Sequence, residues 1–179
     1  MITIIADEGH GTVGQELFRE FGDQGVPVEY ISLENVDVKP CVNCTGCTYK
    51  SYNRCVARDD ADWILPKVIR TDVLVMVTPI TYGGYSFKAK RLLDKLGLIM
   101  DRTYRAQKKE LVKGGLVGRQ FVFFALGVRE DCLTEEEDVF IRLHRETVHI
   151  TRGIGNAFVV DPILLPVQRA EIVHEVDGI

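Results

Sequence analysis

The sequence predicts an α/β fold built on a parallel β-sheet with helices on both faces. Short apolar runs typical of strands alternate along the chain with amphipathic segments typical of helices, which is the pattern of repeated β-α-β units. The run VLVMV, within residues 72–78, is apolar at every position. A strand of this kind is expected in the centre of a parallel sheet, where both of its faces are buried.

Each expected element follows from a local pattern. Apolar or alternating runs predict strands at residues 2–6, 26–33, 72–78, 120–126 and 156–160. Helical spacing of apolar residues predicts helices at residues 15–21, 61–70, 86–100 and 134–151. Asp59 and Asp60 suit the start of the second helix, and Thr134 with Glu137 forms a capping-box pattern for the fourth. Residues 101–118 are expected to be a surface connection, and the tail after Pro162 is weakly patterned.

This order predicts a flavodoxin-like doubly wound five-stranded parallel sheet, formed by a single domain over residues 1–179. In such sheets, ligands bind outside the carboxyl ends of the strands. Three predicted loops leave the sheet at that edge, and they are residues 7–14, 79–85 and 127–133. We therefore look for the functional site among these loops.

Composition limits the classes of partner. The chain is 46% hydrophobic and 27% charged, with a net charge of −4, which argues against broad binding to nucleic-acid phosphates. No apolar run reaches the length that a membrane span requires. The N-terminal segment is too short and too acidic for a signal peptide, so a cytoplasmic, reducing location is expected. There, clustered cysteines more often bind metal or do redox chemistry than form disulfides.

Four of the five cysteines lie in one polar segment, expected to be a loop at residues 38–58. Two residues separate Cys41 from Cys44 and Cys44 from Cys47, and seven residues separate Cys47 from Cys55. A C-x2-C-x2-C run with a fourth cysteine nearby suits an iron–sulfur cluster. Zinc also takes four thiolates, usually from two separated pairs, and thiols without a metal are the third interpretation.

The segment GHGTVG, residues 9–14, matches G-x-G-x-x-G between a strand and a helix. Glycines let backbone amides approach a phosphate, and the helix N-terminus adds positive potential. The residues of this loop that we expect to contact a cofactor are His10, Gly11, Thr12, Val13 and Gly14. Glu34 lies where a dinucleotide-binding fold places its ribose-binding acid, whereas Asp7 and Glu8 oppose a phosphate by like charge.

The second loop, within TPITYGGY at residues 78–85, is suited to a planar ligand. Thr78-Pro79 stiffens the exit of the strand, and Gly83 and Gly84 permit close backbone approach. Tyr82 or Tyr85 could stack on an aromatic ring. We interpret the histidines other than His10 as surface or structural residues, and no catalytic acid or base is expected.

Together, the cysteine run, DDADWILPKVIRTD and TPITYGGYSFKAKRLLDKL resemble the NAD(P)H-dependent FMN reductase family, and specifically its iron–sulfur flavoprotein branch. The resemblance runs most clearly from Val38 to Lys95. It implies FMN and a 4Fe–4S cluster as cofactors, with NAD(P)H as a co-substrate or ferredoxin as an electron source. It also implies a small-molecule or protein electron acceptor and assembly as homodimers or homotetramers.

By this resemblance, the cluster ligands are Cys41, Cys44, Cys47 and Cys55. The residues implied to contact the flavin ring are Pro79, Ile80, Thr81, Tyr82, Gly83, Gly84 and, near the loop after the fourth strand, Gly127. The first loop departs from the Gly-Ser-Pro-Arg pattern of the family, with Asp7 at the serine and Gly9 at the arginine.

Two other functions stay open at this point. One is a dinucleotide-binding protein that uses GHGTVG and holds structural zinc on its cysteines. The other is a member of the family that has lost its flavin through the altered first loop and acts as a binding module. The leading hypothesis is a flavin-dependent oxidoreductase in which the cofactors carry the electrons.

Overall fold

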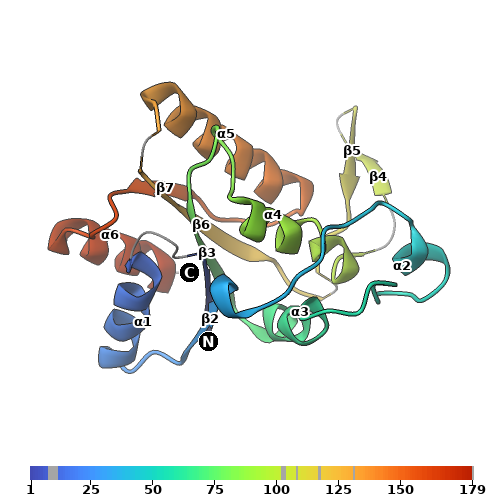
Figure 1. Cartoon of the computed structure of the whole chain (residues 1–179), viewed down its shortest axis with the longest axis horizontal. Coiled ribbons are helices and arrows are strands. Elements are labelled where there is room, and N and C mark those ends of the chain that lie inside the picture. The colour runs from blue at the N-terminus through green and yellow to red at the C-terminus, as the bar shows by residue number, and fades with distance from the viewer. Residues whose placement is uncertain (8–11, 102–103, 108, 117, 131, 179) are drawn as a thin grey trace.

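The main sheet has five parallel strands in the order β2-β1-β3-β6-β7. Figure 1 shows how the helices and strands are arranged. The structure is a computed structural model that describes residues 1–7, 12–101, 104–107, 109–116, 118–130 and 132–178. The strands are β1 (Ile2–Ala6), β2 (Val28–Ser32), β3 (Val73–Pro79), β6 (Val122–Val128) and β7 (Ala157–Val160). This is the strand order of a flavodoxin-like doubly wound fold, so the predicted fold class is confirmed.

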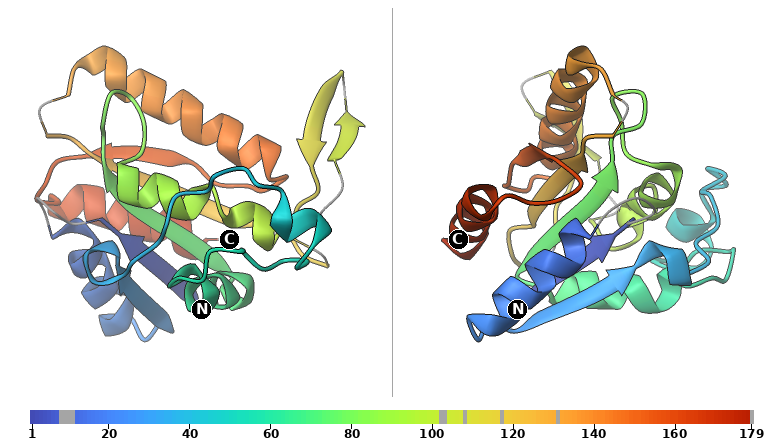
Figure 2. Two further views of the ribbon diagram at one scale, coloured as in Figure 1. Left: turned by 45° about the vertical axis from the view of Figure 1, so that its right-hand side comes forward. Right: turned by 60° about the vertical axis from the view of Figure 1, so that its left-hand side comes forward.

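Helices cover the sheet on both faces (Figure 2). One face packs against α1 (Val13–Asp23) and α6 (Pro166–Asp177). The other face packs against α3 (Ala61–Arg70), α4 (Phe87–Leu93) and α5 (Thr134–Ile150). Within the described residues, no helix combines the length and apolar character needed to cross a membrane.

The alternation of side chains along each strand creates the two apolar layers. In β1, Ile4 and Ala6 belong to the layer beneath α1 and α6, while Ile5 belongs to the layer beneath α3 to α5. All of β3 up to Thr78 is buried, as expected for a strand with neighbours on both sides.

The helix expected at residues 86–100 is wrong in its second half. α4 ends at Leu93, and a single 3-10 turn, η2 (Leu96–Leu98), follows it. Gly97 disfavours a continued helix, and the intervening Lys95 turns its side chain into the protein, where its ammonium group binds the carboxylate of Asp59. The buried ion pair therefore lies where the regular helix stops.

Two further elements were not expected. Residues 101–118 contain an antiparallel hairpin, β4 (Tyr104–Gln107) with β5 (Glu110–Lys113), which stands apart from the main sheet in Figure 1. The tail forms α6, whose Ile172 and Val176 are buried in the layer shared with α1. Pro166 opens α6 at a position where proline is favourable, and this was the overlooked signal.

The predicted caps of two helices need correction, although α3 and α5 begin at the predicted residues Ala61 and Thr134. Asp59 accepts a hydrogen bond from the Ala61 amide at 3.1 Å, as a capping residue does, whereas Asp60 makes no backbone cap to α3. At α5, Thr134 is already inside the helix, and Glu136 rather than Glu137 accepts from the Leu133 amide at 2.9 Å. Glu137 instead binds Arg129.

A buried histidine links α5 to the sheet and confirms the structural interpretation of that residue. His144 is fully buried, with Nε2 3.1 Å from the carbonyl oxygen of Phe123 and Nδ1 2.7 Å from the Tyr85 hydroxyl. A carbonyl can only accept, so Nε2 carries the proton and Nδ1 accepts from Tyr85. Burial lowers the pKa of His144 from 6.5 to about 4.

This burial predicts a pH dependence of stability. Between pH 6.5 and about 4 the unfolded chain binds a proton at residue 144 that the folded chain does not, so stability falls as the pH falls through this range. The loss is about 3 kcal/mol in all. Denaturant unfolding at several pH values gives the free energy of unfolding as a function of pH. Between pH 6.5 and about 4, this free energy should change less steeply with pH in His144→Asn than in the unmodified protein. His174→Asn, at an exposed position, serves as the control and should leave the slope unchanged. An equal slope in His144→Asn would contradict the assignment.

Candidate functional site

Paired aspartates hold together the two ends of the cysteine-rich segment, residues 38–58. The Asp60 carboxylate accepts a hydrogen bond from the Asp37 amide at 2.7 Å, and the Asp60 amide donates to the Asp37 carbonyl at 3.1 Å. The first of these bonds holds the pKa of Asp60 below its usual value. Asp59 accepts from the Lys39 amide at 2.8 Å. The segment is therefore a closed loop whose base lies at the N-terminus of α3.

Within this loop the backbone turns tightly around the cysteines. Asn43, Thr45 and Asn53 have positive φ angles of 50°, 56° and 60°, in the left-handed region that asparagine tolerates better than most residues. Gly46 opens the short helix α2 (Gly46–Tyr49), and a Cβ atom there would lie 2.6 Å from a Val56 methyl group. The two arms of the loop thus pack closely on one another.

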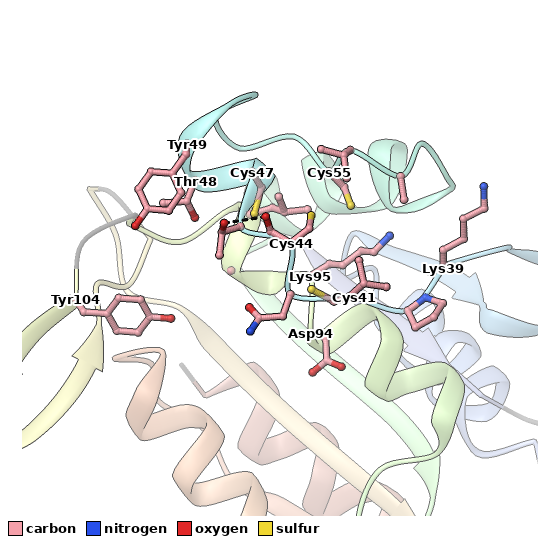
Figure 3. A pocket seen from close by; sticks show the side chains of 18 residues that line it. Lys39, Cys41, Cys44, Cys47, Thr48, Tyr49, Cys55, Asp94, Lys95 and Tyr104 are labelled. Carbon is pink, nitrogen blue, oxygen red and sulfur yellow. Dashed lines mark hydrogen bonds between the residues drawn. The ribbon is translucent and has the colours of Figure 1, made fainter.

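The four cysteines line one cavity of about 600 Å³. Its walls are the cysteine loop, the end of α4 with η2, and Tyr104 of the hairpin, as Figure 3 shows. Cys41 and Cys44 are exposed, whereas Cys47 and Cys55 are half-buried and pack against the apolar core. The structure therefore brings all four predicted ligands to a common space.

The donor set of this cavity fits a thiolate-bound iron–sulfur group. Four thiols from one loop are the ligands that such clusters take, and the cavity gives them a shared volume. Across the described parts of the chain, no three Cys, His, Asp or Glu side chains lie close enough together to hold a single metal ion. Cys132 does not line this cavity and is half-buried between β6 and α5.

A buried ion pair forms part of the cavity wall. Lys95 lines the cavity together with the cysteines, and its ammonium group binds the Asp59 carboxylate. Both side chains are only 1% exposed. Sequence reasoning missed Lys95 because nothing in its neighbourhood indicates a partner 36 residues earlier.

The three predicted strand-end loops leave one edge of the sheet, because β1, β3 and β6 are adjacent and parallel. Pro79 is the last residue of β3, and a two-residue turn follows, closed by reciprocal Thr81–Gly84 backbone hydrogen bonds of 2.9 Å each. Tyr82 and Gly83, the central residues, have positive φ angles of 51° and 73°, as a type I′ turn requires.

Some of the predicted contact residues of this turn are exposed, and others are buried. Tyr82 is 93% exposed at the tip, and Thr81 is also exposed. Ile80 is buried, and its amide donates to the Val128 carbonyl at 3.0 Å, so only its backbone borders the loop. The expectation that Tyr85 could stack on a ligand is wrong, because Tyr85 is a core residue that packs against Phe140 and His144.

Two glycines of this edge, Gly83 and Gly127, are required by close packing. A Cβ atom at Gly83 would lie 2.8 Å from a Val139 methyl group of α5. Gly127 is inside β6 rather than in the loop after it, and a Cβ atom there would lie 2.6 Å from Phe140 and 2.8 Å from Ile80. Gly127 therefore allows α5 and the loop after β3 (residues 80–85, the β3 exit loop) to approach the sheet.

The first loop is described only in part. His10 and Gly11 lie outside the described residues, whereas Thr12 precedes α1, and Val13 and Gly14 form its buried first turn. The hydroxyl group of Thr12 donates to Glu16 at 2.7 Å.

An ionic network lies beside this loop, at the ends of β1 and β2. Lys88 of α4 lies 3.5 Å from the buried Asp7 and also binds Glu34. The hydrogen bond that Lys88 donates to Glu34, with a smaller contribution from Asp7, raises the pKa of Lys88. The positive charge of Lys88 thus offsets the negative charge of Asp7, which was expected from the sequence to repel a phosphate. Its signal in the sequence is a cation in the first turn of a helix, where cations are unfavourable without a partner.

The third loop, after β6, is held by Arg129. Its guanidinium group binds Glu137 of α5 at 2.6 Å and Asp161, just after β7, at 2.7 Å. The hydrogen bond from Arg129 holds the pKa of Glu137 below its usual value. The loop is thereby fixed to both neighbouring elements.

Comparisons with known proteins agree with this geometry. The chain is 33% identical over 89 residues to an iron-sulfur flavoprotein of Methanocaldococcus jannaschii, a match that covers 49% of this chain and 45% of the relative. The chain spans less than half the length of the flavoprotein relatives that it matches.

Solved structures show the same fold. An FMN-dependent NADH-azoreductase from Bacillus anthracis, in complex with FMN, aligns with a TM-score of 0.59 at 16% identity, over 99% of this chain and 95% of its own. A second azoreductase from Bacillus anthracis aligns with a TM-score of 0.62 at 10% identity, over 99% of this chain and 91% of its own.

The family itself is identified by sequence. Residues 9–127 match the model of the NADPH-dependent FMN reductase family. The match extends from residue 9, within the first loop, to the penultimate residue of β6, and so includes most of the first strand-end loop, all of the second and the whole cysteine segment. The chain therefore belongs to the NADPH-dependent FMN reductase family.

Proposed function

We propose that this protein is a flavin-dependent oxidoreductase that binds FMN at the strand-end loops and a 4Fe–4S cluster in the cysteine cavity. The observation that carries the proposal is the gathering of Cys41, Cys44, Cys47 and Cys55 around one cavity at the end of α4. The other end of α4 begins at the β3 exit loop. α4 has 7 residues, so its two ends lie roughly 10 Å apart.

The chain itself would position the flavin rather than react. FMN, when bound, accepts a hydride from NAD(P)H and passes electrons onward. Backbone atoms of Pro79, Ile80 and Gly84 would border its ring, with Thr81 and the exposed Tyr82 beside it. Ser86 fixes this loop, because its amide donates to the Thr78 hydroxyl at 2.9 Å and its own hydroxyl accepts from the Ala89 amide at 3.2 Å.

The cysteine loop would hold the cluster through four thiolates, with the half-buried Cys47 and Cys55 on the side of the apolar core. The names of the Methanocaldococcus relative and of three others support an iron–sulfur group. NAD(P)H or ferredoxin would supply electrons, and a small molecule or a protein would accept them. A homodimer or homotetramer is the proposed assembly.

The dinucleotide-binding alternative receives less support from the geometry. Glu34, its proposed ribose-binding acid, already binds Lys88. Metal content separates this alternative from the main proposal, since zinc without iron would favour it.

The cysteine assignment predicts which thiols are needed. Protein prepared without oxygen should contain iron, acid-labile sulfide and FMN, all quantified on one sample. Cys47→Ser should lose most of its iron and sulfide, because it removes one of four ligands. Cys132→Ser is the matched control and should keep both, since Cys132 does not line the cavity. Protein that lacks iron and flavin under these conditions would refute the proposal.

The ionic network predicts opposite effects on FMN affinity. Lys88→Gln should weaken FMN binding, on the order of tenfold, because Asp7 then repels the phosphate without a neighbouring cation. Asp7→Asn should tighten it. Quenching of FMN fluorescence during titration measures both affinities.

The control for this prediction is Lys90→Gln. Lys90 belongs to the same helix but is exposed and pairs with Asp94, so its loss should change the affinity little. Equal weakening by Lys88→Gln and Lys90→Gln would show that the effect of Lys88 is one of general charge rather than of its place beside Asp7.

A further inference from the structure

Lys95 is a fully buried lysine in the wall of the cysteine cavity. Lysine is rarely buried to this extent unless its charge has a partner. Lys95 and Asp94, from the segment after α4, line the cavity together with the cysteines of the loop, and Figure 3 labels these residues. The buried ammonium group is therefore held out of solvent on a side chain that lines the same cavity as the four thiols.

Asp59 fixes the position of this charge. One oxygen of its carboxylate accepts from the Lys95 ammonium group and from the Lys39 amide, and the other accepts from the Ala61 amide. Asp59 is therefore tied to the base of the cysteine loop and to the start of α3 at once. Lys95 cannot move away from the cavity without leaving a buried carboxylate unpaired, which is costly.

The ammonium group keeps donors to spare. An ammonium group has three N–H donors, and among the residues that the structure describes only Asp59 accepts from Lys95. The other two donors belong to a side chain that lines the cavity shared by the four cysteine thiols. Stability gives little reason to keep such a pair, since an apolar pair of similar volume is often as stable.

We propose that Lys95, held by Asp59, is a positioning residue that offsets the negative charge of the cysteine thiolates and of the iron–sulfur group they would bind. This rests on the cluster assignment of the proposed function, and it adds a residue outside the cysteine motif. The reduced form of a cluster is more negative than the oxidised form, so a nearby cation favours reduction. The lysine should therefore raise the reduction potential of the cluster.

The test compares Lys95→Met with Lys95→Arg in protein loaded with iron and sulfide without oxygen. The midpoint potential is measured by redox titration followed by electron paramagnetic resonance, and iron and sulfide are counted on the same samples. Lys95→Met should shift the potential to a more negative value, whereas Lys95→Arg should restore it. Lys50→Met is the matched control, because Lys50 lies in the same loop but is exposed, and its potential should not change.

A second variant decides the question if Lys95→Met does not fold. Asp59→Asn keeps the lysine and removes the negative charge of the nearby carboxylate, so the potential should shift in the opposite, more positive direction. A loaded Lys95→Met protein with an unchanged potential would overturn this inference and leave the cluster assignment intact. Asp59→Asn with an unchanged or more negative potential would do the same. An unmodified chain that binds no iron would overturn the cluster assignment and this inference together, whether or not FMN binds.

Discussion

The carboxylate of Asp59 is the constraint on which the cysteine site depends. It receives hydrogen bonds from the start of the cysteine loop, from the first turn of α3 and from Lys95, the second residue after α4. These three segments are distant in sequence, and no other single group in the described structure joins all of them. Since a buried carboxylate must have its partners, its burial forces the loop base and the end of α4 into one arrangement. The cavity between them is the consequence.

The strand order adds a second constraint. Adjacent parallel strands deliver the loops after β1, β3 and β6 to one edge, and α4 runs from that edge to the cysteine cavity. The two sites are therefore connected by one short helix, fixed at its start by Ser86 and just after its end by Lys95. A displacement of α4 would disturb both, which is a physical reason to interpret them as parts of one functional unit.

Sequence patterns predicted what local periodicity controls. The five strands and the four expected helices exist, because apolar spacing reports burial on a sheet or helix face. The hairpin and α6 were not predicted. β4 and β5 are only 4 residues each, and α6 lacks a strong apolar stripe. Contacts between residues that are distant in sequence were not predicted for a different reason. The partners of Lys95 and Lys88 come from distant segments, and the burial of Tyr85 depends on His144 of α5.

The altered first loop shows how such a long-range pair changes an interpretation. From the sequence, Asp7 in place of a serine opposes a phosphate at the end of β1. In the folded chain, Lys88 reaches the same place from α4 and shares its charge between Asp7 and Glu34. The local charge is therefore one unit negative rather than two, and an anion must rely on the N-terminus of α1 for attraction. The balance of these three side chains, rather than the missing serine and arginine alone, sets how strongly a phosphate can bind at this edge.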